Sequence, residues 1–281
     1  MPDPVDRIRL SLTFDCASFA RFRRPHRLPV ATAAPPPIPP MSPPALSFRH
    51  IVKRYGSAVA LAGVELQIAP GEFFGLAGMN GAGKTTLIKC LLDATRADEG
   101  DIEIFGSPSR QTAARSRLAF LPERFNAPFY ATGRDFLRLM ARLYGTPFDE
   151  GIAAAMLDQL DLDRSALDRP VRSYSKGMTQ KLGLCAVLLS GRSLLLLDEP
   201  TSGLDPKARA LLKTALRTRH AAGATIFFTS HALADVDEMC DRMAVLHHGA
   251  LRYAGTPAEL RRRTGADTLE QAFLRVIEAK P

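Results

Sequence analysis

The residues that could do chemistry begin with a glycine-rich stretch of the pattern G-x-x-x-x-G-K-[ST], which is Gly78-Met79-Asn80-Gly81-Ala82-Gly83-Lys84-Thr85, followed by Thr86. Glycines let successive backbone N–H groups turn inward around a polyphosphate, and a helix beginning near Lys84 points its positive end at the same charges. The Lys84 ammonium neutralises the β and γ phosphates, and the Thr85 hydroxyl is a hard oxygen ligand suited to Mg²⁺. The stretch therefore predicts a nucleoside triphosphate site lined by residues 80–86.

Two adjacent carboxylates, Asp198 and Glu199, directly follow the apolar run 194–197. A parallel strand ending beside the glycine-rich loop would place Asp198 near the metal and Glu199 near the γ-phosphate. Glu199 is then the candidate general base for an attacking water. Adjacent acids are usually solvated surface, but acids that end a fully apolar strand are harder to explain in that way.

The elements that must position these residues can be predicted from the hydrophobic pattern. Alternating runs at 46–51 and 64–68 indicate strands, and the short apolar run 73–77 indicates a buried parallel strand that opens into the glycine-rich loop. Apolar residues repeat at three and four positions between about 125 and 190, which predicts a helical insertion. Strand patterns return at 194–197, 225–229 and 243–246. The outline is an α/β fold with a helical subdomain.

Composition sets limits on the rest of the chain. Of its 281 residues 46% are hydrophobic and 23% charged, which excludes a wholly disordered or collagen-like protein. The net charge is +8, and residues 1–44 supply +3 of it through six Arg against three Asp. The same segment holds 11 of the 21 prolines, so we expect residues 1–44 to be a disordered or extended Pro/Arg-rich extension. An alternative is that translation starts at Met41.

Three further motifs complete a recognisable set. Between the loop and the acidic pair lies Tyr174-Ser175-Lys176-Gly177-Met178-Thr179-Gln180-Lys181, and after the pair come Ser202-Gly203-Leu204-Asp205 and Thr229-Ser230-His231. In this order the set resembles the ATP-binding-cassette (ABC) ATPases over about residues 45–255. The resemblance implies a P-loop NTPase with a mixed sheet core, an N-terminal antiparallel β subdomain and an inserted α-helical subdomain at about 125–190. Residues 256–281 would form a C-terminal helical tail.

The resemblance also implies roles for single residues. Tyr55 would stack on adenine, and Ser175 and Gly177 would begin a helix that contacts the γ-phosphate held by the other protomer of a head-to-tail dimer. Asp205 would link the two sites, and His231 would touch the γ-phosphate and orient the water. Tyr55 as an edge aromatic and His231 as a polar residue at a helix N-terminus are the alternatives.

Two motifs depart from the family pattern. Lys176 stands where the family usually has a glycine, with Met178 in place of the usual glutamine, and an added positive charge facing phosphate should not weaken ATP binding. Glu123, in Phe120-Leu121-Pro122-Glu123, stands where a glutamine usually contacts Mg²⁺ and water. Glutamate keeps the oxygen ligand but loses the amide donor. This substitution bears on the hydrolysis rate and on coupling to transport.

The tail motifs at 255–260 and 268–273 look like those of single-cassette ATPases of bacterial sodium, drug and polysaccharide exporters. The sequence predicts no membrane-spanning helix, so transport would need separate integral membrane permease subunits and a second cassette subunit, with a homodimer expected. The chain would then lie at the cytoplasmic face of the cell membrane, with no nucleic acid as partner. The alternatives are an importer ATPase or a soluble non-transport ABC ATPase. Four aromatics after Glu123 would form either a groove for a membrane-protein helix or internal core: Phe125, Phe129, Tyr130 and Phe136.

Overall fold

The computed structural model describes residues 43–279. The chain divides into two units, Met1–Met41 and Ser42–Pro281, and the described residues belong to the second. The expectations for the Pro/Arg-rich extension and for a start at Met41 therefore fall almost entirely outside the described residues. Within residues 43–279, no helix is both long enough and apolar enough to cross a membrane.

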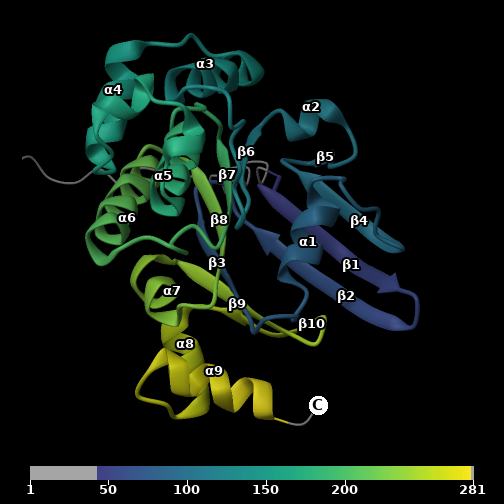
Figure 1. Cartoon of the computed structure of the whole chain (residues 1–281). Helices are drawn as coiled ribbons and strands as arrows, with labels where there is room; N and C mark the ends of the chain where they lie inside the picture. The colour runs from purple at the N-terminus through teal and green to yellow at the C-terminus, as the bar shows by residue number, and fades with distance from the viewer. Residues whose placement is uncertain (1–42, 280–281) are drawn as a thin grey trace, which may run out of the picture. The chain divides into compact units, whose positions relative to one another are not determined.

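A six-stranded sheet has the order β10-β9-β3-β8-β7-β6 (Figure 1). All neighbours in it pair in parallel except β9 and β10. Its strands are β3 (Phe73–Ala77), β6 (Leu118–Leu121), β7 (Leu194–Asp198), β8 (Thr225–Ser230), β9 (Arg242–His247) and β10 (Ala250–Gly255). Because parallel strands end at the same edge, β3, β7 and β8 deliver the residues that follow them to one place.

An antiparallel sheet is built from the first part of the described chain, in the order β2-β1-β4-β5. Its strands are β1 (Leu46–Tyr55), β2 (Ala58–Ile68), β4 (Glu99–Ile104) and β5 (Ser107–Pro108). The alternating runs predicted as strands are the buried halves of β1 and β2. The mixed and antiparallel sheets confirm the predicted α/β class with its N-terminal β part.

Helices fill the region between β6 and β7, as the three-and-four periodicity predicts. They are α3 (Gly133–Tyr144), α4 (Glu150–Gln159) and α5 (Lys176–Leu188), with two 3-10 helices at Arg164–Asp168 and Val171–Ser173. Side chains at the N-caps fix where the helices begin: Thr132 and Asp135 form a capping box for α3, and Ser175 caps α5. These helices lie together on the opposite side of the six-stranded sheet from β1, β2 and β4 (Figure 1).

The remaining helices lie outside the insertion between β6 and β7. They are α1 (Lys84–Leu91), α2 (Thr112–Arg115), α6 (Pro206–Ala221), α7 (Leu233–Met239), α8 (Pro257–Thr264) and α9 (Leu269–Glu278). The last two lie within residues 256–281, the segment expected to form the C-terminal tail.

Both faces of the six-stranded sheet are buried, which explains its continuous apolar runs. Leu195 and Leu197 of β7 pack into one apolar cluster together with residues of α5, α6 and α7. Leu194 and Leu196 point to the other face and pack into a second cluster with α1 and the antiparallel sheet. The strand ends therefore rest on a rigid core.

Candidate functional site

Most of the predicted site residues line one cavity of about 350 Å³. Its lining is Ala60, Met79, Asn80, Gly81, Ala82, Gly83, Lys84, Thr85, Thr86, Glu123, Asp198, Glu199 and His231. The glycine-rich loop comes from the end of β3, the acidic pair from the end of β7, and His231 follows the end of β8. The parallel order β3-β8-β7 is what brings them to one edge.

Two glycines of the loop, Gly78 and Gly83, are required by close backbone contacts. A side chain at Gly78 would place its Cβ 2.6 Å from the backbone oxygen of Leu246, and one at Gly83 would lie 2.6 Å from the backbone oxygen of Ala60. Gly83 also has a φ of +111°, which favours glycine. Gly83 is the N-cap of α1 and has no side chain, so it cannot cap the N–H groups of the helix's first turn. This geometry suits an anion.

Lys84 is buried at the start of α1 and points into the loop. Its Nζ donates to the backbone oxygen of Gly78 at 2.6 Å and to that of Met79 at 3.4 Å. The same Nζ lies 3.7 Å from Oε1 of Glu199. A buried ammonium held by neutral carbonyls and one carboxylate can transfer its hydrogen bonds to phosphate oxygens without moving into solvent.

Thr229 ties the two acidic residues together. Its hydroxyl donates to Oδ1 of Asp198 at 2.6 Å and accepts from the backbone N–H of Glu199 at 3.1 Å. The sequence prediction did not single out Thr229, although a threonine inside an apolar strand just before Ser230-His231 is an available signal. Burial raises the pKa of Asp198, the Thr229 hydrogen bond opposes that rise, and the nearby charges of Glu123 and Glu199 add to it.

Glu199 and His231 form a second pair at the mouth of the cavity. Nδ1 of His231 lies 2.8 Å from Oε2 of Glu199, and the His231 backbone N–H donates to the same oxygen at 3.3 Å. The Glu199 side chain is 7% exposed, whereas the His231 side chain is 66% exposed. Glu199 has a φ of +49°, a backbone conformation that non-glycine residues rarely adopt. The arrangement can orient and deprotonate a water molecule.

The donors at this edge fit Mg²⁺ in their chemistry. Thr85, Asp198 and Glu123 offer one hydroxyl and two carboxylates, the hard oxygen ligands that this ion prefers. Within residues 43–279, no group of three or more His, Cys, Asp or Glu side chains is placed to hold a metal without other ligands. A bound triphosphate and water would have to complete the ligand set, as is usual for Mg²⁺.

Four predicted residues do not line the cavity. Tyr55 ends β1 and is 49% exposed, with the Lys53 ammonium 5.4 Å from its ring centroid. Ser175 is exposed and caps α5, and Gly177 is half-buried in the first turn of that helix. Asp205 is exposed and accepts a hydrogen bond from the backbone N–H of Ala208 at 2.9 Å, which lowers the pKa of Asp205. Their outward positions are those that contacts with another molecule would need.

The four aromatics after Glu123 separate into two groups. Phe136 is buried, and Phe125 packs on it with ring centroids 5.5 Å apart. Phe129 and Tyr130 are 69% and 90% exposed. Phe125 and Phe136 therefore belong to the internal core, as one of the two interpretations expects, and Phe129 and Tyr130 leave an exposed aromatic surface.

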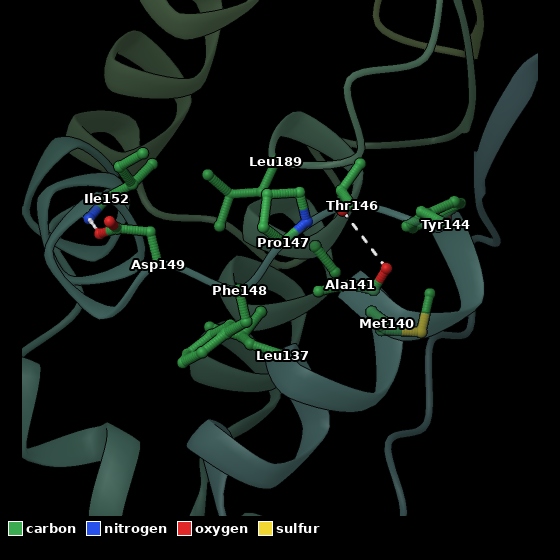
Figure 2. A pocket seen from close by; sticks show the side chains of 11 residues that line it. Leu137, Met140, Ala141, Tyr144, Thr146, Pro147, Phe148, Asp149, Ile152 and Leu189 are labelled. Carbon is green, nitrogen blue, oxygen red and sulfur yellow. Dashed lines mark hydrogen bonds between the residues drawn. The ribbon is translucent and has the colours of Figure 1, made fainter.

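A second cavity, of about 230 Å³, lies among α3, α4 and the end of α5 (Figure 2). Its lining is mostly apolar, and the Asp149 carboxylate in it caps α4 by accepting from the backbone N–H of Ile152. It offers no cluster of donors for phosphate, and the four aromatics do not line it. The candidate nucleotide site is the polar cavity that the glycine-rich loop and the acidic pair line together.

Comparisons with known proteins agree with this geometry. Residues 61–202 match the family model described as ABC transporter. The chain is 36% identical over 235 residues to the Nod factor export ATP-binding protein I of Burkholderia orbicola (strain AU 1054), covering 82% of this chain and 77% of that protein. It is 37% identical to the protein of the same name from Sinorhizobium fredii (strain NBRC 101917 / NGR234), covering 80% and 67%.

Solved structures give the same result for the fold. One described as the ATP binding subunit of an ABC transporter superposes with a TM-score of 0.77 at 30% identity, covering 83% of this chain and 99% of that one. A bacterial Atm1-family ABC exporter with ATP bound superposes with a TM-score of 0.71 at 23% identity, covering 84% and 44%.

Proposed function

The chain belongs to the ABC transporter family as an ATP-binding and ATP-hydrolysing subunit, and from this premise we propose that it drives export through separate membrane subunits. The observation that carries the proposal is the single cavity that joins the glycine-rich loop to the Glu199–His231 pair. The relatives named as Nod factor export proteins support export over import. We propose that the chain acts at the cytoplasmic face of the cell membrane.

ATP binding follows from the loop. The triphosphate would lie against the backbone of residues 80–86, and Lys84 would exchange its two carbonyl partners for β- and γ-phosphate oxygens. Tyr55, half-exposed at the end of β1, would stack on the adenine. When bound, Mg²⁺ would neutralise charge on the β and γ phosphates, held by Thr85, Asp198 and Glu123.

Hydrolysis follows from Glu199. Water attacks the γ-phosphorus while its proton passes to a Glu199 oxygen, and the bond from the γ-phosphorus to the bridging oxygen breaks to leave ADP and phosphate. His231 holds Glu199 through Nδ1 and can turn its other ring nitrogen toward the γ-phosphate and the water. Burial of Glu199 beside Lys84 keeps bulk water from competing with these contacts.

A second copy would complete each site. Ser175, Gly177 and Asp205 belong to the family motif but lie outside this chain's own cavity, at the N-termini of α5 and α6. Docked head to tail, the Ser175 helix of one copy would point its positive end at the γ-phosphate on the other. Binding of two ATP molecules would close the dimer, and hydrolysis would reopen it.

The exposed pair Phe129 and Tyr130 is our candidate contact for a membrane subunit. We expect Phe129→Asp with Tyr130→Asp to remove an integral membrane protein that otherwise copurifies with the tagged chain from solubilised membranes of its native cell. Two charges placed in an apolar contact would be desolvated without partners. ATP affinity should not change, because neither residue lines the nucleotide cavity.

The matched control is Leu274→Asp, which places a charge on an equally apolar and 50% exposed side chain of α9. It should retain the membrane protein. If the parent chain brings no membrane protein with it, the soluble ATPase alternative is favoured. A copurifying solute-binding protein would favour import.

Glu123→Gln should leave the affinity for Mg-ATP almost unchanged, because the amide keeps an oxygen ligand and removes one negative charge from the cavity. Isothermal titration of parent and variant with ATP and Mg²⁺ checks this. A large loss of affinity would show that the Glu123 loop has another role than the one proposed.

A further inference from the structure

The loop that carries His231 also borders a second, smaller cavity. This cavity, of about 90 Å³, is lined by Gly78, Met79, Ser230, His231, Leu233 and Phe273. Phe273 belongs to α9, which lies beyond the matched family region of residues 61–202. The C-terminal tail therefore lines a cavity that shares Met79 and His231 with the candidate nucleotide site.

The tail is fixed to the helix that directly follows His231. Leu269, Ala272 and Phe273 of α9 are buried in the same apolar cluster as residues of α7. An ion pair between Arg261 of α8 and Asp237 of α7 joins the two segments on the surface.

Two hydrogen bonds at the ends of α8 fix the conformation of the C-terminal tail. The Tyr253 hydroxyl donates to the backbone oxygen of Thr256 at 2.6 Å, at the start of α8. Nη1 of Arg275 donates to the backbone oxygen of Gly265 at 2.8 Å, at the end of α8. Because α9 also packs on α7, movement of α9 would be transmitted to α7.

His231 has little else to fix its ring. Its side chain is 66% exposed, and its polar partner within residues 43–279 is Glu199. The loop around it is short: the Ser230 hydroxyl accepts from the backbone N–H of Ala232 at 3.0 Å, and α7 begins at Leu233. A ring held at one end by a carboxylate can swing about that contact unless a neighbouring wall limits it.

We propose that Phe273 is a positioning residue for His231. Its ring, 8% exposed, forms the wall of the small cavity that α9 contributes and limits how far the His231 loop can retreat from Glu199. Phe273 does not line the nucleotide cavity, so it would set the rate of hydrolysis without touching ATP. This inference rests on the proposed roles of Glu199 and His231 and adds the tail as a determinant of their geometry.

Phe273→Ala should lower kcat for ATP hydrolysis about tenfold, because displacement of a catalytic group by a fraction of an ångström is enough for such a loss. The Kd for ATP should not change. Leu274→Ala is the matched control: it removes a side chain of similar size from the same helix, but one that is 50% exposed, and its kcat should equal that of the parent. Phe273→Leu should retain most of the activity, since it keeps an apolar wall.

A double-mutant cycle separates positioning from general loosening of the fold. In a His231→Ala background, Phe273→Ala should have no further effect on kcat in single-turnover measurements with excess enzyme. An equal loss in both backgrounds, or a parent-like kcat for Phe273→Ala, would overturn the inference, and so would a large rise in Kd for ATP. If Phe273→Ala does not fold, Phe273→Leu and Phe273→Met carry the same cycle.

A result that contradicts the role of Phe273 can be distinguished from one that contradicts the proposed function. A parent chain that binds no ATP, or hydrolyses none, would contradict the proposed function itself. A parent chain that hydrolyses ATP, together with a Phe273 effect that persists without His231, would contradict the tail inference alone.

Discussion

Replacing Lys84 with alanine should weaken ATP binding and abolish ATP hydrolysis. The buried ammonium is the positive side chain that reaches both the loop carbonyls and Glu199. Hydrogen bonds to charged groups contribute about 1.5–3 kcal/mol each, so we expect Kd for ATP to rise at least about tenfold. Loss of charge neutralisation at the γ-phosphate should lower the rate further.

The matched control for this variant is Lys89→Ala. Lys89 lies on the same helix α1 but is exposed and outside the cavity, so its removal keeps the helix and changes the net charge equally. It should bind and hydrolyse ATP as the parent does. Undiminished ATPase activity in Lys84→Ala would contradict the assignment of the loop.

Glu199→Gln should lower the rate of hydrolysis about 10²- to 10⁴-fold, the usual contribution of a positioned general base. Glutamine has the same shape and can keep an oxygen near Nδ1 of His231, but it cannot take the proton from water. ATP affinity should be retained or increased, because one negative charge facing the triphosphate is removed. On the same preparation, phosphate release measures the rate of hydrolysis and equilibrium dialysis measures the affinity for ATP.

Glu65→Gln is the control for that substitution, since Glu65 is exposed on β2 and lies outside the nucleotide cavity. Its rate should equal that of the parent. Hydrolysis by Glu199→Gln at the parent rate would show that another group acts as the base.

The sequence was most informative where chemistry and burial coincide. The buried strands β3 and β7 are short apolar runs, and the glycine-rich loop that follows β3 and the pair Asp198-Glu199 at the end of β7 both line the cavity. Parallel pairing needs no side-chain detail to be predicted, because strands buried on both faces are apolar throughout. The loop, the acidic pair, Glu123 and His231 therefore meet as the motif order predicts.

Less could be predicted where side-chain packing between distant segments determines the structure. The patterns above do not identify β4 and β6: β4 has two apolar residues among glycine and acids, and β6 has four residues. The division of the aromatics into core and surface depends on Gly183, since a Cβ there would lie 2.7 Å from the Phe125 ring. Likewise, the approach of Phe273 to His231 joins residues 42 positions apart through the fold of the tail.

The most direct test of the central claim, that ATP held by the loop is enclosed by a second copy, is the mass of Glu199→Gln in solution by sedimentation velocity. With ATP and Mg²⁺ it should sediment as a dimer, and with ADP as a monomer. Adding Ser175→Trp, which blocks the N-terminus of α5, should return it to a monomer that still binds ATP. A chain that stays monomeric while saturated with ATP would contradict the claim.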